Sequence, residues 1–135
     1  MADREAVRRL IEKAYAARSK GDVAGILADF HADASFEFVG ENKLLAMAGV
    51  TRGHSNLTQT MTQLSAAFEF TKRDYISFLI DGDRAAVHSR VTIRFVPKDH
   101  TFTTDILDLF EIRDGKIVEL IEFADTALVK HLTST

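Results

Sequence analysis

The chain has 135 residues, a length that fits one domain with its own hydrophobic core. Apolar residues make up 46% of it and charged residues 27%, which is typical of a folded globular protein and not of a disordered one. The net charge of −3, with scattered Lys and Arg, argues against a nucleic-acid partner, and the absence of cysteine excludes disulfides, thiol nucleophiles and thiolate metal sites.

The first residues lead into an amphipathic segment instead of an apolar run, so we expect no signal peptide. No stretch reaches the roughly 20 apolar residues that a membrane-spanning helix needs. From these features we expect a cytoplasmic protein without a membrane partner.

Three segments in the first half of the chain show the spacing of amphipathic helices. The first runs from Asp3, which can cap it, to Gly21, which can end it. A short second helix follows Asp22, and a third begins at Ser55 or Asn56. Their apolar stripes are formed by Val7, Leu10, Ile11 and Ala14, by Ile26, Leu27 and Phe30, and by Leu57, Met61, Leu64 and Phe68.

The rest of the chain alternates as strands do. A short strand is expected over 35–39, and four longer ones over about 70–80, 84–96, 101–112 and 117–125. Asp114-Gly115 predicts a tight two-residue turn, because both central residues of such a turn need a positive φ. The sequence of segment 41–53 is compatible with one helical turn and with a loop.

Helices that precede a run of sequential strands predict an α+β fold, with the helices packed on one face of an antiparallel sheet. The chain contains no linkers or repeats, so we expect one domain over 1–135. A curved sheet with helices across its mouth encloses a cone-shaped cavity of the kind that holds small molecules.

Four motifs in this order resemble the nuclear transport factor 2-like superfamily, which includes SnoaL-like polyketide cyclases and ketosteroid isomerases. The motifs are Lys20-Gly-Asp22, Phe30-His-Ala-Asp-Ala34, Gly53 before the third helix, and the segment 114–127. The resemblance covers nearly the whole chain. It implies a cystatin-like curved antiparallel sheet with about three N-terminal helices over it and a conical cavity between them.

The ketosteroid isomerase pattern fits only in part. The position of its general base is occupied by Phe38, which cannot move a proton, and the position of its first-helix Tyr by Ala14, with Tyr15 one residue further on. Asp108 matches its second oxyanion donor, a protonated Asp. The resemblance therefore argues against steroid isomerisation by that mechanism.

Two other branches of the superfamily carry over further residues. Limonene-epoxide hydrolases resemble the chain at Arg90, with Thr92 in place of the first acid and Glu122 at the position of the second. The essential acid of the SnoaL-like cyclases is matched by Asp108. The resemblance thus implies Asp108, Glu122 and Arg90 as catalytic residues.

The same geometry implies a substrate-binding surface around these residues. It is expected to consist of Tyr15, Phe36, Phe38, His88, Thr92, Phe110 and Leu120. A carboxyl group buried among phenylalanines has a raised pKa and can act as acid or as base near neutral pH. Arg90 would keep a second carboxyl ionised, so that the two could divide the acid and base roles.

The function implied is that of a cofactor-independent enzyme for proton transfer on a small hydrophobic, cyclic metabolite: an isomerase, a cyclase, or a hydratase or epoxide hydrolase. Three alternatives stay open. Arg90, Asp108 and Glu122 can be an ion-pair network that only stabilises the sheet. The domain can also be a non-catalytic binding module for a hydrophobic ligand, which the Phe at position 38 favours, or a protein-interaction module.

The five histidines show no metal-ligand spacing, so neither a metal nor a cofactor is expected. Several apolar strand residues are expected on the outer face of the sheet, which the helices cannot cover. They are Val87, Val91, Ile93, Leu107, Leu109, Ile117 and Ile121. An exposed apolar face marks an interface, and we expect a homodimer formed sheet to sheet.

Overall fold

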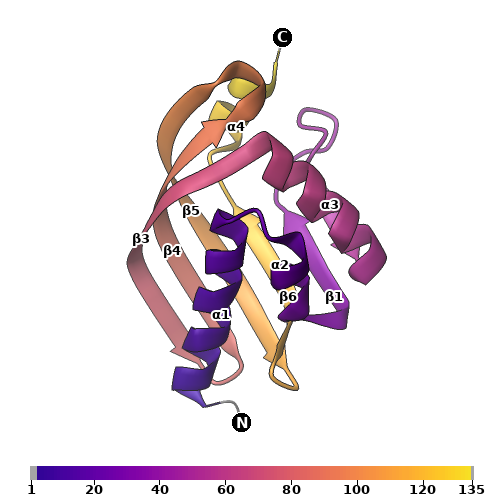
Figure 1. The fold of residues 1–135 in the computed structure, drawn as a ribbon, viewed down its shortest axis with the longest axis vertical. Coiled ribbons are helices and arrows are strands. Elements are labelled where there is room, and N and C mark those ends of the chain that lie inside the picture. The colour runs from indigo at the N-terminus through magenta and orange to yellow at the C-terminus, as the bar shows by residue number, and fades with distance from the viewer. Residues whose placement is uncertain (1–2, 135) are drawn as a thin grey trace.

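A computed structural model describes residues 3–134 of the chain. Three helices lie across one face of a strongly curved sheet, and a fourth lies near the C-terminus (Figure 1). The elements are α1 (Arg4–Ser19), α2 (Val23–Ala28), β1 (Phe30–Phe38), β2 (Gly49–Arg52), α3 (His54–Ala67), β3 (Phe68–Asp81), β4 (Arg84–Phe95), the 3-10 turn η1 (Val96–Lys98), β5 (His100–Arg113), β6 (Lys116–Phe123) and α4 (Thr126–Thr133).

The six strands form one sheet in the order β2-β1-β6-β5-β4-β3. All neighbouring strands are antiparallel except β1 and β6, which run parallel. The sheet is therefore mixed, whereas the sequence predicted a purely antiparallel one. The parallel pair arises because α3 and three long strands separate β1 from β6 in the sequence. The predicted α+β fold is confirmed.

The helix ends follow from local hydrogen bonds. The side chain of Asp22 accepts a bond of 3.0 Å from the backbone N–H of Gly25 and so caps α2, as expected. Helix α3 begins at His54, earlier than either expected cap, because Gly53 with a φ of 82° turns the chain into it. Helix α4 is not among the predicted helices, and Asp125 caps it by accepting a hydrogen bond of 3.0 Å from the N–H of Leu128.

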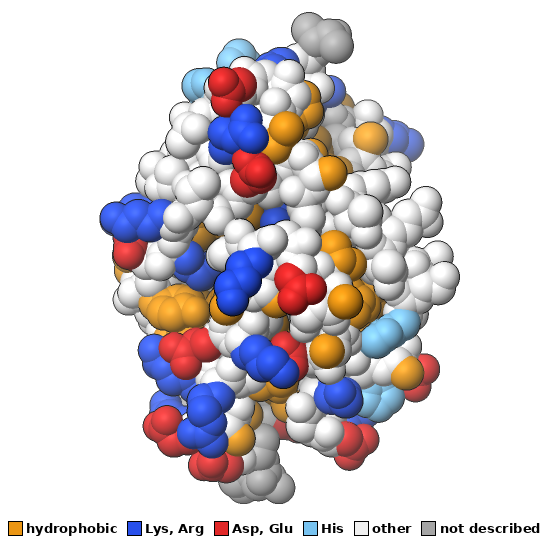
Figure 2. Space-filling view, in the orientation of Figure 1, with side chains coloured by type: hydrophobic (Ala, Val, Ile, Leu, Met, Phe, Trp, Pro, Cys, Tyr) orange, Lys and Arg blue, Asp and Glu red, His pale blue; other side chains and the backbone are white. Residues whose placement is uncertain are grey.

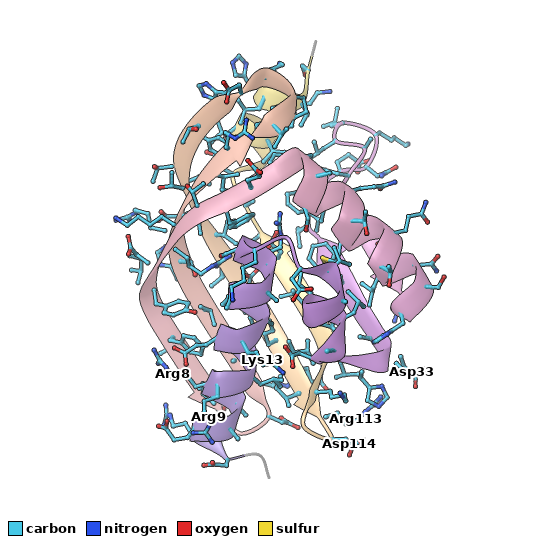
Figure 3. All side chains as sticks on the ribbon, viewed as in Figure 1. Arg8, Arg9, Lys13, Asp33, Arg113 and Asp114 are labelled. Carbon is cyan, nitrogen blue, oxygen red and sulfur yellow. The ribbon has the colours of Figure 1, made fainter. Side chains whose placement is uncertain are left out.

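The Asp114-Gly115 turn fixes the pairing of β5 with β6. Both residues have a positive φ, 54° and 73°, as a tight two-residue hairpin turn requires. The hairpin begins with Arg113 opposite Lys116, and beyond a register irregularity at Glu111 the ladder places Asp108 opposite Glu122. In Figure 3 this turn lies at the lower edge of the sheet, with the side chain of Asp114 pointing out of the domain.

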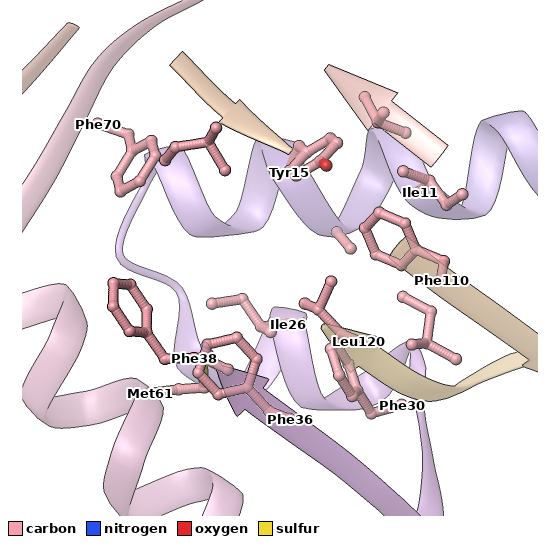
Figure 4. Close-up of a cluster of buried hydrophobic side chains, with 14 of the residues drawn as sticks. Ile11, Tyr15, Ile26, Phe30, Phe36, Phe38, Met61, Phe70, Phe110 and Leu120 are labelled. Atoms are coloured by element: carbon pink, nitrogen blue, oxygen red, sulfur yellow. The ribbon is translucent and has the colours of Figure 1, made fainter. Parts of the chain in front are cut away.

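The core lies between the helices and the concave face of the sheet. Figure 4 shows Ile11 and Tyr15 of α1 facing aromatic side chains of β1 and β5. Charged side chains such as Arg8 and Lys13 project outward from α1 (Figure 3), and both signs of charge are mixed on this side of the molecule (Figure 2). None of the helices within residues 3–134 is long and apolar enough to cross a membrane.

The faces of β4 are the reverse of the prediction. Val87, Val91 and Ile93 are 0%, 0% and 4% exposed and lie on the concave face, where they pack in the core. His88 and Arg90 lie on the outer face. The reason is visible in the alternation of the strand: apart from Ala86, the positions that share a face with Arg90 are polar or charged, and apart from Ser89 the others are apolar.

Ile117 is also buried, at 0% exposure, instead of lying on the outer face. A register irregularity in the β5–β6 ladder separates the pairs Ile112–Ile117 and Glu111–Glu119, and it shifts the alternation of β6 at this point. Leu107, Leu109 and Ile121 do lie on the outer face, as expected: Leu107 and Leu109 are 39% and 37% exposed, and Ile121 pairs with Leu109.

The face assignment of β4 can be tested by a pair of truncations. Val91→Ala removes two methyl groups from a fully buried side chain, and we expect a loss of about 1–3 kcal/mol in the free energy of unfolding. Thr92→Ala, on the outer face of the same strand, should cost less than about 1 kcal/mol. Urea unfolding of both variants measures this, and a larger loss for Thr92→Ala would contradict the assignment.

Candidate functional site

A cavity of about 90 Å³ lies between the helices and the concave face of the sheet. Its wall is apolar for the most part and holds seven phenylalanines. They are Phe30, Phe36, Phe38, Phe68, Phe70, Phe102 and Phe110, and Figure 4 shows five of them around one space. Five ionisable side chains interrupt this wall, namely Tyr15, Arg18, Arg73, Asp108 and Glu122.

Asp108 is the most deeply buried of these groups, at 0% exposure. It projects from the middle of β5, and the hydroxyl of Tyr15 on α1 donates a hydrogen bond of 2.6 Å to its Oδ2. Its cross-strand neighbour on β6 is Glu122, which is next to Phe38 on β1. Phe38 of β1, Glu122 of β6 and Asp108 of β5 thus lie side by side across three strands, and all three line the cavity.

The surroundings favour a proton on Asp108. Burial raises the pKa of its carboxyl well above the ordinary value, and the charge of Glu122 and a hydrogen bond between the two carboxyl groups raise it further. The hydroxyl of Tyr15 and the charge of Arg73 act in the opposite direction, but the effect of burial is larger. Asp108 Oδ1 has no hydrogen-bond partner within the described residues, which also disfavours a negative charge there.

Tyr15 is held in place from three sides. Its ring meets Phe110 edge-on at a centroid distance of 5.8 Å and Tyr75 at 6.0 Å, while the guanidinium of Arg73 lies 3.7 Å from the ring centroid. Burial raises the pKa of the Tyr15 hydroxyl well above its ordinary value, and the hydrogen bond to Asp108 acts in the same direction. Tyr15 therefore acts as a hydrogen-bond donor and stays protonated.

Arg73 reaches the cavity because β3 is irregular. The β3–β4 register shifts between Phe70 and Lys72 and again between Tyr75 and Ser77. The first shift turns Arg73 onto the concave face, opposite the buried Val91. Its Nη1 donates to the hydroxyl of Ser89 at 2.9 Å, and its Nε is buried without a partner within the described residues.

Arg18 closes the cavity from the end of α1. Its Nη2 donates to two backbone oxygens where α3 passes into β3, those of Leu64 at 3.3 Å and Phe68 at 2.9 Å. Its guanidinium also lies 4.4 Å from the ring centroid of Phe70. Burial lowers its pKa to about 10, and the charge of Glu122 opposes this effect.

Arg90, His88 and Thr92 do not take part in this site, so the prediction that they face the cavity is wrong. Arg90 binds both oxygens of Asp105 at 2.9 and 3.3 Å, and His88 contacts the same carboxylate at 2.9 Å. Thr92 pairs with the hydroxyl of Thr103 at 3.2 Å. All of these contacts lie on the outer face, where solvent is present; the hydrogen bonds from Arg90 and His88 lower the pKa of Asp105 to about 2.

The other predicted positions do line the cavity. They are Tyr15, Phe36, Phe38, Asp108, Phe110, Leu120 and Glu122, and their catalytic and binding roles remain predictions. Sequence reasoning missed Arg18 and Arg73. Arg18 follows Ile11, Ala14 and Tyr15 at helical spacing, which could have placed it on the buried stripe of α1, whereas no periodicity indicates Arg73.

Within residues 3–134, no group of three or more His, Asp or Glu side chains is arranged to hold a metal ion. The chemistry that the site supports with its own residues is therefore hydrogen bonding and proton transfer among Tyr15, Asp108 and Glu122, beside two guanidinium groups.

This architecture is that of the nuclear transport factor 2-like class. An NTF2-like protein of unknown function from Burkholderia pseudomallei superposes with a TM-score of 0.83 at 17% identity, over 100% of each chain. TerC, crystallised with polyporic acid, gives a TM-score of 0.81 at 21% identity, over 94% of this chain and 97% of the other. An LEH-like epoxide hydrolase from M. tuberculosis gives a TM-score of 0.75 at 17% identity, over 95% of this chain and 90% of the other. These identities show the fold alone.

The family is shown by the sequence itself. Residues 7–120 match the model of the SnoaL-like domain, and the chain belongs to this family. The resemblance inferred from the sequence motifs is thereby confirmed. Comparison with curated proteins gives no match.

The protonation of Asp108 has a consequence for stability. A carboxyl whose pKa is raised by folding keeps its proton to a higher pH than the unfolded chain does. The free energy of unfolding therefore falls as the pH rises above about 4, by at most about 1.4 kcal/mol per pH unit for one proton. Asp108→Asn should lose this dependence and be more stable than the wild-type protein at pH 8.

Urea unfolding between pH 5 and pH 8 measures the effect. Asp99→Asn is the matched control, since Asp99 is exposed and its left-handed backbone, with a φ of 47°, also suits Asn. Its pH dependence should equal that of the wild-type protein. An equal slope for Asp108→Asn and the wild-type protein would contradict the burial of a protonated carboxyl.

Proposed function

We propose that the protein is a cofactor-independent enzyme that transfers protons on a small hydrophobic, cyclic metabolite. The observation that carries this proposal is the fully buried Asp108 beside Glu122 at the floor of an apolar cavity. A second carboxyl and a tyrosine next to a buried acid supply the donors and acceptors of general acid–base catalysis. The epoxide hydrolase and TerC, which share the fold, give this reading further support.

In the proposed mechanism Asp108 is the acid and Glu122 the base. Glu122, which is less buried, takes a proton from a carbon atom of the substrate, and Asp108 gives its proton to another atom of the same molecule. The product is an isomer, and the proton has moved to Glu122. It returns to Asp108 through the hydrogen bond between the two carboxyl groups, which restores the starting state. Tyr15 stabilises Asp108 in its ionised form during the cycle.

A second candidate is a binding module without catalysis. It is favoured by Phe38, which occupies the position that the resemblance gives to a general base, and by a cavity of only about 90 Å³. In this case Asp108 and Glu122 would only orient a ligand. The two candidates differ in whether a carbon-bound hydrogen of the ligand exchanges with solvent.

Exchange in heavy water tests the proposal. Small cyclic ketones, enones and carboxylic acids are incubated with the protein in D₂O, and deuterium uptake at carbon is followed by NMR and mass spectrometry. We expect exchange of at least one member of the panel, and a decrease of about 100-fold or more in Asp108→Asn, since positioned acids and bases contribute 10²–10⁴.

Asp105→Asn serves as the control, because Asp105 lies on the same strand but on the outer face and contacts Arg90. It should leave the exchange rate unchanged. Exchange that persists in Asp108→Asn would contradict the acid role, and a panel member that binds in the cavity without exchange would favour the binding module.

We also propose a homodimer formed through the outer face of the sheet, in the cytoplasm. Three apolar side chains on this face are well exposed, namely Leu79, Leu107 and Phe123 at 62%, 39% and 41%. Leu109 lies in the same row of the sheet as Leu79, through Ala86. Exposed apolar side chains on adjacent strands favour an interface.

Light scattering at micromolar concentration tests the dimer. The wild-type protein should have twice the mass of the chain, and Leu109→Glu should reduce it to that of a monomer, because a charge would be buried without a partner. Leu44→Glu, at an exposed residue of the loop before β2, is the control and should remain dimeric. A monomeric wild-type protein would overturn the proposal.

A further inference from the structure

The three arginines of β4 and the two arginines of the cavity differ in their partners. Arg84, Arg90 and Arg94 are exposed or half-exposed, and each of them makes a salt bridge with a carboxylate. Arg18 and Arg73 line the cavity, and neither makes a salt bridge within residues 3–134. Nε of Arg73 is buried and has no partner within the described residues. A buried charged donor needs a partner more than an exposed one does, so the cavity has a requirement that the described part of the chain does not meet.

The contacts of Arg73 show which of its atoms are free. Nη1 is engaged by the hydroxyl of Ser89, and the plane of the guanidinium lies over Tyr15. The opposite edge, formed by Nε and Nη2, makes no hydrogen bond within residues 3–134, and Nε is buried. This is the edge with which Arg90 binds the two oxygens of Asp105. Arg73 therefore presents an unoccupied fork of the shape that a carboxylate fits.

The charged groups of the cavity also favour an anionic ligand. The cavity holds two guanidinium groups, those of Arg18 and Arg73, and two carboxyl groups, those of Asp108 and Glu122. Because burial favours the protonated form of Asp108, at most one of these carboxyl groups is an anion, and the cavity can take a further negative charge. Arg18 is already bonded to two backbone oxygens, which leaves the free fork of Arg73 as the place for that charge.

We infer that the ligand of this cavity is an apolar cyclic molecule that carries one carboxylate, and that Arg73 binds the carboxylate through Nε and Nη2. This inference gives the substrate class of the proposed function and rests on the same cavity. The carboxylate would lie beside Tyr15, because the guanidinium covers the ring of that residue. The apolar part of the ligand would then lie among the phenylalanines, with Asp108 and Glu122 within reach.

Benzoate and benzamide test the inference, because they have the same shape and differ in charge. Binding of each is measured by NMR titration of the labelled protein, which gives the dissociation constant and the residues that respond. We expect benzoate to bind at least about tenfold more tightly than benzamide, with shifts at cavity residues such as Thr104 and Ile106. Arg73→Gln should weaken benzoate by about 10- to 100-fold, as the loss of a charge-assisted hydrogen bond does.

Two controls distinguish a specific loss of benzoate binding in Arg73→Gln from damage to the fold. Benzamide should bind Arg73→Gln as it binds the wild-type protein, and Arg90→Gln, on the outer face, should change neither ligand. If Arg73→Gln does not fold, Arg73→Lys takes its place; it keeps the charge but loses the fork, and should weaken benzoate about tenfold.

Equal affinity of the wild-type protein for the two ligands would overturn the inference. An unchanged preference for benzoate in Arg73→Gln or Arg73→Lys would overturn it as well. Shifts confined to the outer face, or no cavity shifts with either ligand, would also overturn it. Benzamide that binds in the cavity as well as benzoate would leave the proposed acid–base function standing, because that function is judged by exchange at carbon and not by charge preference.

Discussion

The hydrogen bond between Tyr15 and Asp108 is the contact on which the site depends. It joins two residues 93 positions apart, one on the first helix and one in the middle of the sheet, and both are buried. A carboxyl in that place is costly unless it is protonated or well bonded. Helix α1 supplies the bond and at the same time excludes water from the carboxyl. The packing of α1 therefore affects both the shape of the cavity and the pKa of Asp108, which burial raises.

Asp105 and Asp108 show that the surroundings, and not the residue type, define the site. Both lie on β5, but they face opposite sides of the sheet. On the outer face Arg90 and His88 bind Asp105, and these hydrogen bonds lower its pKa to about 2. On the inner face burial raises the pKa of Asp108 well above its ordinary value. The same side chain is thus a permanent anion on one face and a carrier of a proton on the other.

The class of fold, the order of most of its elements and the Asp114-Gly115 turn could be predicted from the sequence, because helical spacing and turn residues are local signals. The irregularity in the β5–β6 register could not. The faces of β4 were predicted wrongly, since a resemblance at Arg90 was given more weight than the alternation of its own strand. Arg73 could not be predicted at all. Two register shifts in β3 place it in the cavity, and bulges leave no mark on the periodicity of a sequence.

The difference between Arg73 and Arg90 explains why the cavity is better understood as a site than as a core. A core can bury a guanidinium at tolerable cost only when the chain supplies its anion. Even the exposed Arg90 has such an anion, Asp105. For Arg73 the chain supplies a hydroxyl, an aromatic ring and no carboxylate within the described residues. Such an arrangement costs stability in the empty protein, and the cost is recovered when a ligand brings the missing charge. The polar groups of the cavity are therefore complete only in a complex.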